Sequence, residues 1–99
     1  MSEPMGDEAA LPLAWRILLT VHDEQIARGD RAQQGVPLTR LSKRLDASVS
    51  VLMREITMLT DAVLGTQRGP GLLRMWQDEG RWLVVLTPEG GDLLSAQGF

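Results

Sequence analysis

The chain has 99 residues, of which 43 % are hydrophobic and 23 % are charged, so its length suits one globular domain and argues against a second. It has no cysteine, which excludes disulfide bonds and thiolate metal ligands, and a single histidine leaves little from which to build a catalytic or metal site. The net charge is -3, yet residues 28–54 carry six basic and two acidic side chains, so the charge does not exclude a polyanionic partner.

The first residues predict a flexible tail. Residues 1–9 are polar and acidic and contain Pro4 and Gly6, so we expect one domain to begin at about residue 10 and to run to residue 99. The tail lacks the positively charged region of a secretory signal, and the apolar run at residues 17–19 is too short to span a bilayer. We therefore expect a cytoplasmic protein with no membrane contact.

The first helix is predicted from Pro12 to about Arg28, since proline suits the first helical position and Gly29 ends the pattern. Side chains that we expect on its buried stripe recur with a period of 3.6 residues: Leu11, Ala14, Trp15, Leu18, His22 and Ile26. Ile17 and Leu19 lie on either side of this stripe. An apolar arc of that width predicts contacts on several sides or with a second subunit.

A polar loop is predicted at residues 29–35, followed by a short second helix. Three leucines at helical spacing mark that helix: Leu38, Leu41 and Leu45. Its outer side carries three basic side chains: Arg40, Lys43 and Arg44. A local basic patch matters more than the total charge, because charges more than about 8 Å apart are largely screened at physiological salt.

A third helix is predicted from an N-cap at Ser48 to about residue 63, after a tight turn at Asp46 and Ala47. Its predicted buried positions are Leu52, Ile56, Leu59 and Val63. The opposite face carries Ser50, Arg54, Thr57 and Asp61. Arginine can pair with guanine through two hydrogen bonds, and a small hydroxyl can reach a base or a phosphate, so this face has the chemistry of a DNA recognition helix. The same pattern also describes an ordinary amphipathic helix with a solvated outer face.

Beyond Leu64 the apolar period changes to strict alternation, which predicts strands at residues 72–77 and 81–86 joined by a turn in which Gly80 is left-handed. Thr87 and Pro88 then have the chemistry that starts a short final helix. A second interpretation places a tight turn at residues 65–71. These elements predict an α+β fold that is mainly α, with a three-helix core, a small antiparallel sheet with a hairpin, and a C-terminal helix.

The stretch from Leu41 to Leu64 has two leucines four apart, a turn, a Ser-x-Ser helix start and an arginine, and it resembles the helix-turn-helix of MarR-type transcription regulators. The segment Leu86-Thr-Pro-Glu-Gly90 is similar to the one that follows the wing in that family, so the resemblance covers residues 38–90. It implies a winged helix-turn-helix that binds double-stranded DNA as a homodimer. Ser48, Ser50 and Arg54 would then start the recognition helix.

The sequence departs from the family in three places. Asp46 and Val63 stand where the family has glycines, and Asp78 and Glu79 put negative charge at the expected wing tip. Arg81 would lie near that tip, or Arg68 would take its place if the turn falls at residues 65–71. The candidate DNA-binding residues are Arg40, Lys43, Arg44, Ser48, Ser50, Arg54, Thr57, Arg68 and Arg81.

We expect the homodimer to form through the first helix and the termini, with Leu93, Leu94 and Phe99 as candidates, because little chain follows Leu86. No catalytic residue, cofactor, metal site or dedicated small-molecule effector is expected, and we do not expect an enzyme. The alternative is a winged-helix module that binds a protein partner rather than DNA, which the acidic turn and the overall acidity favour.

Overall fold

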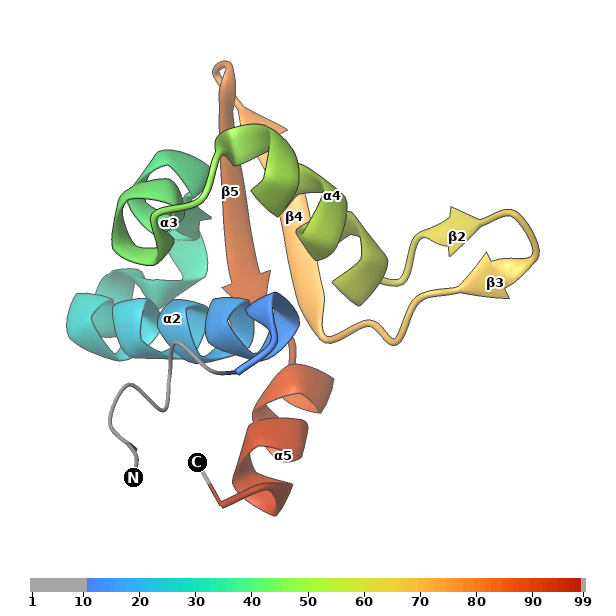
Figure 1. Ribbon diagram of the computed structural model, residues 1–99. Helices are drawn as coiled ribbons and strands as arrows, with labels where there is room; N and C mark the ends of the chain where they lie inside the picture. The colour runs from blue at the N-terminus through green and yellow to red at the C-terminus, as the bar shows by residue number, and fades with distance from the viewer. Residues whose placement is uncertain (1–10, 99) are drawn as a thin grey trace, which may run out of the picture.

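The computed structural model describes residues 11–98, so the expected tail and the contribution of Phe99 lie outside the described residues. The described chain has an α+β fold with four α-helices and small antiparallel sheets (Figure 1). In chain order its elements are α2 (Leu13–Arg28), the 3-10 helix η1 (Gly29–Gln34), β1 (Val36–Pro37), α3 (Leu38–Leu45), α4 (Val49–Leu59), β2 (Val63–Leu64), β3 (Gln67–Arg68), β4 (Leu73–Asp78), β5 (Arg81–Leu86) and α5 (Pro88–Ala96). None of its helices is long and apolar enough to cross a membrane.

The main sheet has the strand order β1-β5-β4 and is antiparallel throughout. The predicted hairpin is confirmed: β4 and β5 pair from Leu73 opposite Leu86 to Asp78 opposite Arg81. Glu79 and Gly80 close it with φ angles of 51° and 80°, as a two-residue turn of a twisted hairpin requires. The polar segment at residues 29–35 was predicted as a loop, whereas most of it forms η1, and the short edge strand β1 that follows was not predicted.

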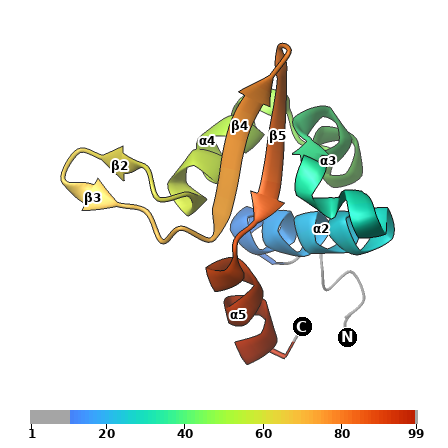
Figure 2. The same ribbon diagram turned by 180° about the vertical axis from the view of Figure 1, so that it is seen from behind.

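Helices α2, α3 and α4 lie on one face of the β4–β5 hairpin, as the front and back views show (Figures 1 and 2). The three leucines of α3 are buried, which confirms its predicted inner face; in α4 the predicted buried positions Leu52 and Ile56 are confirmed, whereas Leu59 is only partly buried. Their side chains share one core with residues from α2, the sheet and α5: Ile17, Leu18, Val21, Val36, Leu73, Val84 and Leu94.

The buried face of α2 differs from the predicted stripe. Its buried residues are Ile17, Leu18, Thr20, Val21 and Glu24. Of the predicted stripe only Leu18 is fully buried, His22 is partly exposed, and Ile26 is 67 % exposed. Glu24 lies on the buried face because it binds arginines of α3, and the buried Thr20 hydroxyl is satisfied within the helix, since it donates to the Arg16 carbonyl over 2.7 Å.

Helix α4 ends at Leu59, four residues earlier than predicted, and Val63 is 63 % exposed in β2 rather than buried. In a longer helix the Leu59 and Thr60 carbonyls would accept hydrogen bonds from Val63 and Leu64. Instead, the Leu59 carbonyl accepts from the Leu72 N–H over 2.7 Å, and the Thr60 carbonyl accepts from the Gly71 N–H over 3.2 Å. The chain therefore leaves the helix and runs alongside its own return segment.

Residues 60–71, called the arm below, form a two-stranded ribbon that stands out from the rest of the described chain (Figures 1 and 2). Strands β2 and β3 pair near its tip, and the Gly69 N–H donates to the Ala62 carbonyl over 3.0 Å at its root. A Cβ atom at Gly69 would overlap the Thr60 carbonyl oxygen, so the two segments approach closely only because this residue is glycine. The predicted alternative turn at residues 65–71 thus belongs to a second hairpin.

Candidate nucleic-acid interface

The turn between α3 and α4 is braced by hydrogen bonds from both helices. Asp46 adopts the left-handed conformation, with φ 53° and ψ 47°, so it takes the backbone shape that a glycine would supply. The Ser42 hydroxyl donates to the Ala47 carbonyl over 2.6 Å. Ser48 caps α4, since its hydroxyl accepts from the Val51 N–H over 3.2 Å, which confirms the predicted cap. The start of α4 is therefore fixed relative to α3.

The outer face of α4 presents three of its four candidate residues. Ser48, Ser50 and Arg54 are exposed, and within residues 11–98 Arg54 has neither an ion pair nor a hydrogen-bond partner. Thr57 is partly buried, and its hydroxyl donates to the Met53 carbonyl over 2.7 Å. The first half of the helix thus offers free polar donors, whereas the hydroxyl of Thr57 is already used within the helix.

The tip of the β4–β5 hairpin lies close to this face. A groove of about 290 Å³ separates the start of α3, the start of α4 and the hairpin, and it is lined by Pro37, Leu38, Thr39, Val49, Gly80, Arg81 and Trp82. Figure 1 shows the hairpin tip and the first turn of α4 toward the same end of the molecule. Arg81 is exposed at the rim, opposite Asp78 on the neighbouring strand. The structure therefore places Arg81, rather than Arg68, beside the hairpin tip.

Two of the three candidate basic residues of α3 are bound to an acidic residue of α2. The Glu24 carboxylate, only 7 % exposed, accepts hydrogen bonds from Arg40 over 3.1 Å and from Arg44 over 3.0 Å. Arg28 lies 3.8 Å from the same carboxylate. These arginines are partly neutralised, whereas Lys43 is exposed without an ion pair among the described residues.

The ionisation of Glu24 reflects this arrangement. Burial by itself raises the pKa of the Glu24 carboxyl, but hydrogen bonds from Arg44 and Arg40 and their positive charges outweigh burial and hold the pKa below its usual value. Glu24 was not among the residues predicted from the sequence, because its partners lie 16 and 20 residues away along the chain. No spacing within one helix could have indicated these contacts.

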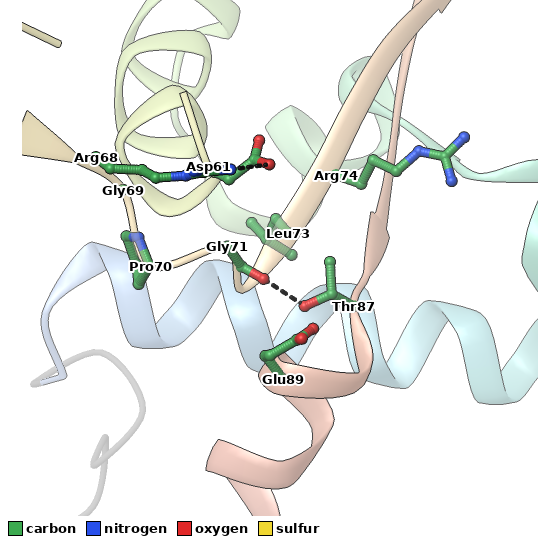
Figure 3. Close-up of a pocket in the computed structure, with 9 residues that line it drawn as sticks. All are labelled: Asp61, Arg68, Gly69, Pro70, Gly71, Leu73, Arg74, Thr87 and Glu89. Atoms are coloured by element: carbon green, nitrogen blue, oxygen red, sulfur yellow. Dashed lines mark hydrogen bonds and ion pairs between the residues drawn. The ribbon is translucent and has the colours of Figure 1, made fainter. Parts of the chain in front are cut away.

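Arg68 lies on the arm, which begins at the opposite end of α4 from Ser48 (Figure 1). Its guanidinium is 3.5 Å from the Asp61 carboxylate, and both side chains are more than 70 % exposed. A hollow of about 380 Å³ at the root of the arm is lined by acidic and basic side chains together: Asp61, Arg68, Arg74 and Glu89. Figure 3 shows Arg74 pointing away from Arg68 and Asp61, so the two arginines do not converge on one ligand position.

Comparisons with known proteins do not identify a relative whose function could be compared with this geometry. No family model, no curated protein and no solved structure matches the chain. Within residues 11–98, no group of three histidine, aspartate or glutamate side chains is placed to hold a metal ion. The outer face of α4, the groove beside it and the charges around them are therefore the features from which a function can be inferred.

Proposed function

We propose that this chain is a transcription regulator of the winged helix-turn-helix class, similar to MarR-type proteins, that inserts the N-terminal half of α4 into the major groove of double-stranded DNA. The observation that carries this proposal is the unpaired Arg54 on an exposed face that also presents Ser48 and Ser50. The braced turn between α3 and α4, and the hairpin tip across the groove from α4, support the winged arrangement.

The major groove admits an α-helix, and the side chains on the exposed first turns of α4 suit its donor and acceptor pattern. Arg54 can donate two hydrogen bonds to guanine, while the serine hydroxyls can reach a neighbouring base or phosphate. Lys43 and Arg81 are exposed and have no ion pair within the described residues, so they are available to phosphates. Two basic side chains at phosphates predict a slope of about -2 for log K against log salt for each bound copy, at roughly -0.9 per phosphate contact.

The test is binding of the purified chain to duplexes selected from a random pool, measured by fluorescence anisotropy at low and at physiological salt. We expect R54A to lose roughly 5- to 150-fold in affinity, since a bidentate contact to guanine contributes about 1–3 kcal/mol. R31A is the matched control, because Arg31 is exposed on η1 and its removal changes the net charge equally.

The control also defines the results that would contradict the proposal. Equal losses for R54A and R31A would mean that α4 does not read bases. No duplex binding by the unmodified chain at low salt would remove the DNA proposal altogether.

We further propose that two copies bind two half-sites about one helical turn apart, which predicts a palindromic selected sequence.

A second candidate function, a module that binds a protein partner, is favoured by apolar side chains on the same helix. Val51 is 38 % exposed and Met58 is 45 % exposed, and they lie on the same side of α4 because they are seven residues apart; apolar side chains gathered on an exposed face are typical of a protein contact. Failure of duplex binding, together with partner capture that V51S weakens, would favour this function. We propose no catalytic role in either case.

A further inference from the structure

The arm has no part in the proposed contact with DNA. It starts at the C-terminal end of α4, whereas Ser48, Ser50 and Arg54 lie in the first half of that helix. Its root is rigid, because three backbone hydrogen bonds link residues 59–62 to residues 69–72 over 2.7–3.2 Å. The residues from Val63 to Arg68 are all exposed. A ribbon this well braced and this exposed presents a defined surface to a partner.

Each face of the ribbon carries one exposed apolar side chain. Val63 is 63 % exposed and Leu64 is 49 % exposed, and consecutive residues of a strand point to opposite faces. An isolated two-stranded hairpin is at best marginally stable in water, and unpaired strand edges readily accept another strand. Burial of these side chains against a partner would therefore stabilise the arm as well as the complex.

The charges of the arm indicate which partner fits. Asp61 and Arg68 are its only charged residues, so its net charge is zero although the whole chain carries -3. A nucleic-acid backbone gains little from an arginine that already faces a carboxylate 3.5 Å away. A two-fold contact, by contrast, places one patch against itself and needs a self-complementary surface. One carboxylate, one guanidinium and the apolar side chain of Val63 on the same face satisfy that need.

We propose that the arm is the docking site for a second copy of this chain, with the two arms in contact around a two-fold axis. Val63, which shares a face of the ribbon with its cross-strand partner Arg68, becomes buried in the contact, and Arg68 of each copy faces Asp61 of the other. The expectation from the sequence was an interface on the first helix. In α2, however, Ile26 is the one large apolar residue that is exposed among those described. The arm proposal does not depend on DNA binding.

Sedimentation equilibrium of the full 99-residue chain tests the proposal. We expect a dimer whose dissociation constant rises at least about tenfold in the double variant V63S/L64S and stays within about twofold in I26S. Both changes replace exposed apolar residues, and circular dichroism should show the same helix content in all three proteins. A monomeric parent chain, or loss of the dimer in I26S with retention in V63S/L64S, would overturn the proposal.

Charge exchange gives a second, independent readout. D61R leaves two positive charges on each arm and R68D leaves two negative charges, so we expect each variant alone to be mostly monomeric. An equimolar mixture should recover the dimer, because the arms then carry opposite charges. No recovery would contradict the arm-to-arm contact. An arm variant that weakens duplex binding without changing the oligomeric state would instead make the arm a DNA contact.

Discussion

Replacing Glu24 by glutamine tests how the arginines of α3 are held. The carboxylate is 7 % exposed and accepts two hydrogen bonds, of 3.1 and 3.0 Å, from Arg40 and Arg44. Hydrogen bonds to charged groups contribute about 1.5–3 kcal/mol each, but the arginines are 57 % and 39 % exposed and glutamine keeps one acceptor oxygen. We therefore expect E24Q to lower the free energy of unfolding by about 1–3 kcal/mol, or the midpoint temperature by roughly 5–15 °C.

The effect depends on pH with a defined sign. The pKa of Glu24 in the folded chain lies below its usual value of 4.5, so the folded state binds this proton less readily than the unfolded state does. The stabilisation is fully present above pH 4.5 and is lost as the pH falls through the lower pKa of the folded chain. The difference in unfolding free energy between the parent chain and E24Q should shrink over that interval.

Urea unfolding followed by circular dichroism, from neutral pH down to about pH 3, measures this difference. E79Q is the control, because Glu79 is exposed at the hairpin tip and has no ion pair within the described residues. It removes the same charge and should cost less than about 0.5 kcal/mol. A cost for E24Q that equals the cost for E79Q, or that stays constant with pH, would refute the reasoning.

Two further predictions compare neighbouring positions by thermal unfolding. A Cβ atom at Gly90 would overlap the Leu72 carbonyl oxygen, so G90A should lower the free energy of unfolding by about 1–3 kcal/mol. At Gly91 the nearest atom to such a Cβ is 4.0 Å away, so G91A should raise the free energy of unfolding by roughly 0.5–1 kcal/mol. If G90A were as stable as G91A, this packing would be contradicted. S48A should cost about 1 kcal/mol by removing the cap of α4, while S50A should leave stability unchanged and, under the proposed function, weaken DNA binding; equal stability losses would argue against the cap.

The parts of the fold that were predicted correctly depend on local chemistry. The spacing of the leucines in α3, the Ser48 cap and the Gly80 turn are each set by residues within one or two helical turns of each other. The buried positions Leu52 and Ile56 followed from helical spacing in the same way. Periodicity and turn chemistry act over such short distances, so they can be inferred from one sequence.

The incorrect predictions share a different cause, which is that partners distant in sequence override the local pattern. Val63 continues the helical spacing, but carbonyls at the end of α4 bind N–H groups from residues 71 and 72. Glu24 interrupts the apolar pattern of α2, yet it is buried because Arg40 and Arg44 lie against it. Hydrophobic spacing within one helix contains no information on either set of contacts, so it predicted the end of α4 and the buried face of α2 incorrectly.

The ion pairs of Glu24 also change the expected strength of DNA binding. Residues 28–54 carry six basic side chains, but Arg28, Arg40 and Arg44 all lie within 4 Å of one carboxylate that comes from outside that segment. Under the proposed function, each copy then offers few free cations, and its affinity for one half-site should be modest and only moderately sensitive to salt.

Two linked copies would overcome this weakness, because binding of the first half-site raises the effective concentration of the second copy at the other. The two proposals therefore predict a joint result. V63S/L64S should reduce affinity for a two-site palindrome much more than affinity for a single half-site, whereas R54A should reduce both. If V63S/L64S weakened binding to the palindrome and to the single half-site by the same factor, the arm would contact DNA itself. Linkage of two copies through the arm would then not explain the affinity.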